Sequence, residues 1–256
     1  MTGAHSRLAA RAAVPVALVL LWQIAVSSGL LPESYASSPA GVVRALSDLN
    51  DRDVLWPSLA KSLQRAALGF LIGGGLGMVF GTIVGLSSRA ETGLDATFQA
   101  FRALPHFALI PLLLIWFGIG EAPKVALIAL ASFFPIYLNL YKSIRGIDPR
   151  LHELAMVQKL TPWQRLTSIT LPGALPGLLI GARYSLAGAW LSLIVAEQFN
   201  ARSGIGFVTM QARLFSQIST IVACLFLYAL IGILIDVVVR LAERNLIGWH
   251  ASEAHR

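Results

Sequence analysis

The chain has 256 residues, of which 56% are hydrophobic and only 13% are charged. Soluble domains carry about 25% charged residues, and the mean hydropathy of +0.70 lies far on the apolar side, so the composition excludes a soluble domain. The net charge of +7 suits a nucleic-acid ligand, but in membrane proteins Lys and Arg gather in cytoplasmic loops and set the orientation. The chain is therefore predicted to be an integral membrane protein with no nucleic-acid partner.

Six stretches of the chain are long and apolar enough to cross a bilayer, which takes about 20 residues of helix. They cover residues 12–32, 66–88, 103–120, 125–141, 174–196 and 214–235, and only the fifth contains a charged residue, Arg183. Helices satisfy their own backbone hydrogen bonds inside lipid. The expected fold class is therefore all-α integral membrane, a six-transmembrane-helix bundle that forms a single domain over residues 1–256.

The orientation is predicted from the basic residues. With the N-terminus inside, the inner segments hold more Lys and Arg than the outer segments, to which Arg65 and Lys124 are assigned. Because positive loops stay in the cytoplasm, we expect both termini to be cytoplasmic. One alternative stays open, since Arg7 and Arg11 before the first apolar stretch also fit a signal peptide.

Glycines and prolines mark the interior of the predicted bundle. Glycines recur at every fourth position along one stripe of the second span, at Gly69, Gly73, Gly77, Gly81 and Gly85. Such a stripe lets a neighbouring helix approach closely, either as static packing or as a moving contact. Pro105 and Pro111 in the third span and Pro135 in the fourth predict kinks, because proline removes a helical hydrogen bond.

The few polar side chains inside the spans are the candidates for a substrate pathway. Arg183 lies about 14 Å into its span if that helix begins near Ala174. It therefore needs an anionic solute as its partner, or it must reach the cytoplasmic headgroups. His106 is the only histidine in a span and predicts an interhelical hydrogen bond or a pathway role. Tyr184 follows Arg183 and belongs to the same candidate set.

Further charged groups stand at the span ends. Glu197 ends the fifth span on the outer side, where it is expected to act as a gate or as a structural cap, and it completes the set of pathway candidates. Asp236 and Arg240 stand four residues apart at the inner end of the last span. This spacing favours an ion pair on one face of a helix.

The inner loop of residues 143–172 carries signals for two short helices. Asp148 followed by Pro149 is typical of a helix start, and the first helix is expected to run to about Leu160. Thr161 and Gln164 stand at capping-box spacing and start the second helix.

The first of these helices has an apolar face on a loop that is otherwise polar. Leu151, Leu154 and Ala155 lie near this face, and Glu153 and Lys159 lie elsewhere on the helix. The face is either a docking surface for a partner, as exposed apolar patches often are, or the underside of a lid that folds onto the bundle.

The loop resembles the EAA loop of ABC-importer permeases. The matching strings are Glu153-Leu154-Ala155, then Lys159, then Ile169-Thr170-Leu171-Pro172, at the spacing of that motif. Leu154 stands where the family has alanine, and Lys159 stands where it has the glycine between two coupling helices. The resemblance implies that the loop sits in a groove of an ATP-binding subunit. The residues that it assigns to this contact are Glu153, Leu154, Ala155, Met156, Lys159, Leu160, Thr161, Pro162 and Trp163.

The resemblance extends from about residue 30 to residue 248 and is carried by several further strings. The most specific are Leu104-Pro105-His106, Ile110-Pro111-Leu112, Trp116-Phe117-Gly118-Ile119-Gly120, Phe134-Pro135-Ile136-Tyr137 and Ser203-Gly204-Ile205-Gly206. They are similar to the nitrate, taurine and aliphatic-sulfonate branch of the family, and most similar to the sulfonate permeases.

The resemblance implies a type I ABC-importer permease in the bacterial cytoplasmic membrane. The partners that it implies are two ABC ATPase subunits, a second permease copy, a solute-binding protein and membrane lipid. The solute that it implies is an aliphatic sulfonate, with taurine, nitrate, bicarbonate or a small heterocycle as alternatives within the branch. ATP and Mg would be held by the ATPase subunit, so no cofactor is expected in this chain.

The residues themselves support this division of labour. The chain contains no Gly-x4-Gly-Lys-Ser/Thr phosphate loop, no His-Glu-x-x-His motif and no plausible Ser/His/Asp set. It is therefore predicted not to be an enzyme, and its energy source must lie on another polypeptide. A gradient-driven secondary transporter fits less well, because it needs titratable groups inside its spans. A membrane enzyme fits less well, because it needs clustered carboxylates, metal ligands or an activated nucleophile.

Overall fold

The computed structural model describes residues 2–32 and 36–246, and this part of the chain contains helices and no strand. The elements in chain order are α1 (Thr2–Ser27), α2 (Pro39–Asp51), α3 (Leu55–Leu86), α4 (Ser88–Ala90), η1 (Glu91–Asp95), α5 (Ala96–Ala103), η2 (His106–Leu109), α6 (Ile110–Phe117), α7 (Ala122–Arg145), α8 (Pro149–Val157), α9 (Pro162–Arg165), η3 (Leu166–Thr170), α10 (Leu171–Asn200), α11 (Ile205–Leu214) and α12 (Ile218–Leu246). Within the described residues, four helices are long and apolar enough to cross a membrane. The expected all-α membrane fold is confirmed.

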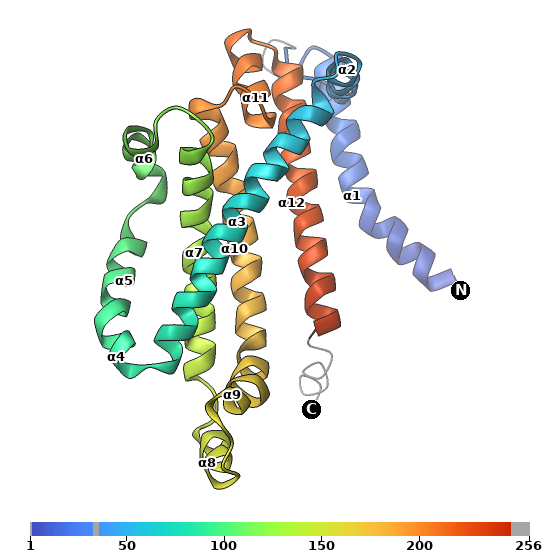
Figure 1. Ribbon diagram of the computed structural model, residues 1–256. Coiled ribbons are helices and arrows are strands. Elements are labelled where there is room, and N and C mark those ends of the chain that lie inside the picture. Colours follow the sequence, from blue (N-terminus) through green and yellow to red (C-terminus); the bar gives the residue numbers. More distant parts are fainter. Residues whose placement is uncertain (1, 33–35, 247–256) are drawn as a thin grey trace.

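Three long helices, α3, α7 and α10, form the centre of the bundle (Figure 1). Both α3 and α10 pack mainly against α7. Ser132 of α7 and Ser185 of α10 are fully buried, and the Ser185 hydroxyl donates a hydrogen bond to the Ser132 carbonyl oxygen. A Cβ added to Gly181 of α10 would lie 2.9 Å from the carbonyl oxygen of Pro135. Backbones that approach this closely hold helices together where lipid supplies no hydrophobic drive.

The glycine stripe of α3 faces α7, as its spacing predicts. Its five members, Gly69, Gly73, Gly77, Gly81 and Gly85, are all buried. A Cβ added to Gly77 would lie 2.6 Å from the Phe133 carbonyl oxygen, and one added to Gly81 would lie 3.0 Å from that of Tyr137. A residue with a side chain would push the two helices apart, so glycine is what allows α3 and α7 to touch along their length.

The third predicted span is broken into two arms. The segments Ser88–Ala103 and His106–Phe117 meet at an angle of 86° and together count as one possible crossing. The predicted span of residues 103–120 therefore covers only the second arm. The bend lies at the predicted kink, because Pro105 forces the preceding Leu104 into extended backbone with φ −74° and ψ 132°.

The predicted count of six spans is met in part. With the broken pair counted as one crossing, the described residues contain five candidates. The first predicted span, residues 12–32, overlaps α1, whose strongly apolar part is Ala17–Ser27. The sixth crossing therefore stays a prediction. The last three predicted spans fall largely within α7, the continuous helix Pro162–Phe199, and α12.

The two ends of the bundle differ in what they carry. Figure 1 shows α8 and α9 beyond one end of the long helices, and α2 and α11 at the opposite end. The predicted positions of two residues outside the spans, in the outer segments, are wrong. Arg65 lies within α3 and Lys124 within α7, and their side chains are only 2% and 4% exposed. The assignment failed because every charged residue was taken to end an apolar run.

Candidate functional site

The loop of residues 143–172 forms the two short helices that its sequence predicts. Asp148 caps α8 by accepting a hydrogen bond at 2.9 Å from the backbone N–H two residues on. Thr161 and Gln164 form the predicted capping box of α9, in which the Gln164 N–H donates to Thr161 Oγ1 at 3.3 Å and the Thr161 N–H donates to Gln164 Oε1 at 2.8 Å. The one difference is that α8 ends at Val157, before Leu160.

Lys159 makes the turn between α8 and α9. Its φ of +53° lies in the left-handed region. The Lys159 N–H donates to the Met156 carbonyl oxygen at 3.0 Å, and the Leu160 N–H donates to that of Ala155 at 3.0 Å. These two bonds are the Schellman motif, which satisfies the last carbonyls of a helix and usually has glycine at the left-handed position. The lysine thus forms the turn at the position where the EAA pattern has glycine.

Most side chains assigned to the ATPase contact are accessible. Exposed are Glu153, Leu154, Met156, Lys159, Thr161, Pro162 and Trp163, whereas Leu160 is half-buried and Ala155 is buried. Large apolar groups are prominent, with Val157 80% and Trp163 70% exposed. Figure 1 shows α8 projecting beyond the bundle, so the loop is not a lid folded onto it. Exposed apolar surface of this kind marks a site for a partner.

The second short helix is connected directly to a membrane helix. From Pro162 to Phe199 the chain is one helical rod of 38 residues, in which α9 passes through the π-helical turn η3 into α10. Single π-helical turns inside long helices are frequent at functional sites. The loop is therefore joined to the centre of the bundle without a break in the helix.

A cavity of about 910 Å³ opens between the broken pair and the helices α3, α7 and α10. Its wall is largely apolar, and its polar side chains are those of Arg102, His106, Asn139 and Tyr184. The structure thus brings two of the four pathway candidates, His106 and Tyr184, to one cavity. Arg183 and Glu197 are not among its lining residues, and a pathway role for them stays a prediction.

His106 and Arg183 each have a protein partner. His106 Nε2 lies 3.2 Å from Ser192 Oγ of α10, which confirms the expected interhelical hydrogen bond. Arg183 donates to Asp236 of α12 at 2.9 Å. Asp236 also pairs with Arg240, as their spacing predicts.

Arg65 is the centre of a buried polar cluster at the end that carries α2 and α11. This Arg65 cluster consists of Ser62, Arg65, Glu121, Lys124, Glu197 and Ser203. Arg65 donates to both carboxylate oxygens of Glu121 at 2.6 and 2.8 Å, and to Glu197 at 2.6 Å. Glu197 is fully buried and also accepts hydrogen bonds at 2.8 Å from the Ser62 hydroxyl and from the Gly206 N–H. A buried charge needs such complete pairing.

The Arg65 cluster joins four helices. Arg65 comes from α3, Lys124 from α7 and Glu197 from α10, while Ser203 stands two residues before the start of α11. The hydrogen bonds from Arg65 lower the pKa of Glu121 to about 2. This carboxylate therefore stays ionised throughout the physiological pH range, and the contact between the helices persists with it.

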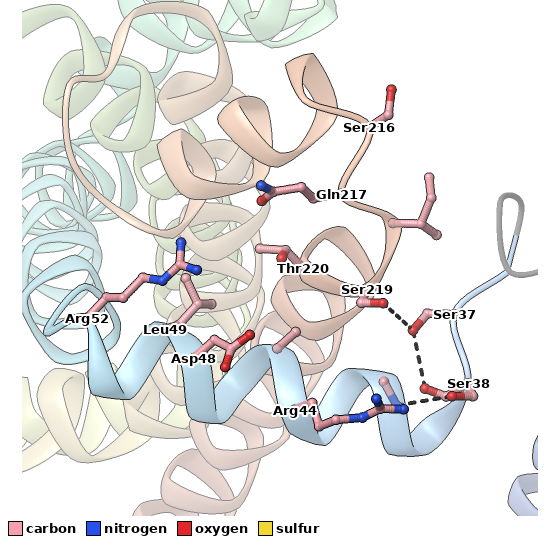
Figure 2. A pocket seen from close by; sticks show the side chains of 13 residues that line it. Ser37, Ser38, Arg44, Asp48, Leu49, Arg52, Ser216, Gln217, Ser219 and Thr220 are labelled. Atoms are coloured by element: carbon pink, nitrogen blue, oxygen red, sulfur yellow. Dashed lines mark hydrogen bonds between the residues drawn. The ribbon is translucent and has the colours of Figure 1, made fainter.

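A second pocket, of about 540 Å³, lies at the same end, between α2 and the turn before α12. Figure 2 shows Arg44, Asp48 and Arg52 along α2 on one side of it. Ser37 donates a hydrogen bond to the Ser219 hydroxyl at 2.9 Å and so fastens the start of α2 to α12. The charged wall suits polar groups of a partner, in contrast to the apolar cavity inside the bundle.

Sequence reasoning did not single out Arg65, Arg102, Glu121 or Lys124 as site residues. Each lies beside or just outside an apolar run that was ended at the nearest charge. The available signal was their position, because charged residues next to a span often face the protein interior or a cavity.

These features define the chain as a membrane transport permease, with a cavity among its apolar helices and an exposed two-helix loop for a partner. Over residues 73–248 it matches the family described as binding-protein-dependent transport system inner membrane component, and it belongs to this family. It is therefore a multi-pass inner-membrane subunit of an ABC transporter, works with ATPase subunits and is not itself an enzyme. The resemblance stated from the sequence is confirmed.

Relatives match almost the whole chain. A protein of Escherichia coli (strain K12) named putative aliphatic sulfonates transport permease protein SsuC is 46% identical over 93% of this chain and 90% of its own length. Its namesake in Bacillus subtilis (strain 168) is 41% identical over 93% of this chain and 87% of its own length. The taurine transport system permease protein TauC of Escherichia coli is 30% identical over 91% of this chain and 86% of its own length.

The fold is also shared with a solved structure. A chain of the MetNI methionine ABC transporter, in an inward-facing conformation, aligns with a TM-score of 0.52 and 20% identity over 71% of this chain and 94% of that chain. At an identity this low, the similarity shows a shared fold and carries no information about the solute. The expected type I importer fold is confirmed.

Proposed function

We propose that the chain is the membrane-spanning permease of an ATP-driven importer of aliphatic sulfonates. The observation that carries this proposal is the identity of 41% and 46%, over 93% of the chain, to the two permeases named for aliphatic sulfonates. A match of this extent includes the helices that line the cavity and the loop formed by α8 and α9.

The cavity supports this solute class. An aliphatic sulfonate has an apolar tail and one anionic head, and the cavity has an apolar wall with a few polar side chains. Its volume of about 910 Å³ is ample for a small organic anion. Taurine, the second candidate through TauC, also carries an ammonium group, and none of the described residues that line the cavity is acidic. The lining therefore favours an unsubstituted alkyl sulfonate over taurine.

The α8–α9 loop supports a mechanism for the coupling to ATP. In this proposal its exposed residues, among them Glu153, Leu154 and Trp163, dock in a groove of the ATPase. Closure of two ATPase subunits then moves α9, and the continuous helix carries the movement into α10. The two halves of the permease rock as rigid bodies, and the cavity opens first to one side of the membrane and then to the other.

The same proposal includes the assembly and its orientation. Two ATPase subunits hold ATP and Mg, and this chain pairs with a second copy. A solute-binding protein docks at the end that carries α2 and α11, where the polar pocket of Figure 2 lies. The end that carries α8 and α9 faces the cytoplasm, as do both termini.

Transport by the reconstituted system tests the proposed solute. The permease, its ATPase and its solute-binding protein are reconstituted in liposomes, and the uptake of radiolabelled ethanesulfonate, taurine and nitrate is measured with and without ATP. We expect ATP-dependent uptake to be fastest for ethanesulfonate. Faster uptake of nitrate, or no stimulation by any sulfonate, would contradict the proposed solute.

A charge reversal on α8 tests the proposed coupling. Glu153 is exposed, so Glu153→Lys leaves the fold intact and repels a basic contact on the ATPase. We expect a loss of most ATPase from the tagged permease on co-purification. The control is Asp51→Lys, an exposed acid at the end of α2 on the far side of the bundle, which is expected to co-purify normally. Equal yields for the two variants would exclude Glu153 from the contact.

A further inference from the structure

Among the residues that the structure describes, Arg102 is the one charged side chain in the wall of the cavity. It lies in the last turn of α5, two residues before the bend at Leu104. Its side chain is exposed, and within residues 2–32 and 36–246 it forms no ion pair and no side-chain hydrogen bond. The structure thus presents a cation to the cavity without a carboxylate to neutralise it.

A ladder of contacts between η1, α5 and α7 fixes the depth of Arg102. The pairs are Tyr141 donating to Glu91 at 2.5 Å, Tyr137 donating to Asp95 at 2.7 Å, and Phe98 with Phe133, whose ring centroids lie 5.4 Å apart. Because α7 runs antiparallel to η1 and α5 in these pairs, Arg102 lies level with about residue 130 of α7. Leu130 indeed lines the same cavity. That level is eight residues, or about 12 Å, into a helix of 24 residues.

An arginine at this depth of a hydrocarbon core of about 30 Å requires a partner. Arg183, the arginine that the sequence singled out, already has one in Asp236. Lys124 and Arg65 likewise pair with Glu121. Arg102 differs from all three, because none of the described residues that line its cavity carries a carboxylate.

We propose that Arg102 binds the anionic head group of the solute as it passes through the cavity. A guanidinium offers a planar fork of donors that matches the oxygens of a sulfonate, and it stays charged at every physiological pH. The apolar wall contacts the alkyl tail of the solute. Arg102 therefore selects for the negative charge, and the wall selects for the apolar tail. The inference rests on the proposed function and names the residue that gives the permease its preference for anions.

Substitution of Arg102 provides the first test, in the complete reconstituted importer. We expect Arg102→Gln to lower ethanesulfonate uptake about tenfold or more, because a charge-assisted contact is lost. Arg102→Lys should retain an intermediate rate, since it keeps the charge but not the fork. The matched control is Arg89→Gln, an exposed arginine on α4 of the same broken pair that does not line the cavity. It should stay within about twofold of the wild type, as expected for a surface charge.

Chemical rescue separates the charge of Arg102 from a role in packing. The background is Cys224→Ala, because Cys224 is the only cysteine of the chain. Arg102→Cys in this background is expected to be inactive. Aminoethyl methanethiosulfonate, which attaches a cation, should restore uptake, whereas carboxyethyl methanethiosulfonate, which attaches an anion of similar size, should not.

The outcomes distinguish the proposed function from the proposed role of Arg102. No uptake of any sulfonate by the wild-type importer would overturn the proposed function and this inference with it. Uptake by the wild type that Arg102→Gln leaves within twofold, or equal rescue by both reagents, would overturn the inference alone. Loss of uptake with rescue by the cationic reagent only would establish Arg102 as the anion-binding residue.

Discussion

Lys159 holds a backbone conformation that is unfavourable for a residue with a side chain. At φ +53° its Cβ is crowded by the following carbonyl, at a cost of about 1–2 kcal/mol that glycine avoids. Glycine also raises the conformational entropy of the unfolded chain, which offsets part of this gain in stability. We predict that Lys159→Gly stabilises the turn by about 0.5–1 kcal/mol. Slower hydrogen exchange of the Leu160 amide, which donates to Ala155, is the measurement.

The neighbouring position supplies the control for this prediction. Gln158 has an ordinary φ of −76°, so Gln158→Gly gains no relief and adds only flexibility. The Leu160 amide should then exchange faster than in the wild type. Faster exchange in Lys159→Gly as well would show that the lysine side chain itself holds the turn.

Glu197 is a carboxylate that the fold buries completely. It accepts hydrogen bonds from Arg65, Ser62 and the Gly206 N–H. Glu197→Gln keeps the shape of the side chain but removes its negative charge. It also places the new amide NH₂ group against the donors that Glu197 accepts from. We predict a loss of about 3–5 kcal/mol, as for other broken buried pairs, measured by thermal unfolding in detergent.

A second carboxylate in the same cluster provides the comparison. Glu121 is half exposed, so Glu121→Gln removes an ion pair that water partly screens. The expected loss is about 1 kcal/mol. Equal losses in the two variants would mean that burial does not decide the strength of these pairs.

Residues whose partners are local could be predicted from the sequence, and residues with distant partners could not. The caps at Asp148 and Thr161 use atoms two or three residues away, so their spacing was sufficient. Arg65 meets Glu197 across 132 positions of the chain. No pattern in the sequence near Arg65 indicates that Glu197 is its partner. Hydropathy alone places a charged residue outside a span.

At the scale of elements, the contact between α3 and α7 depends on the absence of side chains. A Cβ added to Gly73 would run into the backbone carbonyl of Ala129, which has no freedom to rotate away. We predict that Gly73→Ala lowers the free energy of unfolding by about 3 kcal/mol, at the upper end of overpacking effects. Thermal unfolding followed by tryptophan fluorescence measures this loss.

Gly75 on the same helix is the matched control, because nothing lies within 4 Å of a Cβ added there. Gly75→Ala should change the free energy of unfolding by less than about 1 kcal/mol, with helix propensity favouring alanine. If Gly73→Ala proved equally harmless, α3 and α7 would form a sliding contact and not a static one, which is the alternative that the glycine spacing leaves open.

The glycine stripe and the kink at Pro105 were predictable because each is written into one segment. The first arm of the broken pair was not, since η1 and its neighbours contain Glu91 and Asp95. Their carboxylates are satisfied by Tyr141 and Tyr137 of α7. Hydropathy takes no account of these distant partners. The first arm, Ser88–Ala103, was therefore left out of the predicted span, although it forms one possible crossing together with the second arm.

At the scale of the whole molecule, the path of α1 determines whether the bundle has six crossings. Trp22 near its end stacks on Phe226 near the start of α12, with ring centroids 5.9 Å apart. This contact holds the end of α1 close to the beginning of α12. The 26 residues of α1 measure about 39 Å as a helix, enough to cross a hydrocarbon core of about 30 Å. Exposed apolar side chains such as Val14, Leu18 and Leu21 suit contact with lipid.

We therefore predict that position 2 and the α8–α9 loop lie on the same, cytoplasmic side of the membrane. Single cysteines are introduced in the Cys224→Ala background by Thr2→Cys, Val157→Cys and Phe215→Cys, and intact cells or spheroplasts are treated with a membrane-impermeant maleimide. Phe215, which is 73% exposed between α11 and α12, should be the only position labelled from outside. The other two should react only after the membrane is permeabilised. Labelling of position 2 together with Phe215 would mean that α1 does not cross, and that the bundle has five crossings with its N-terminus outside.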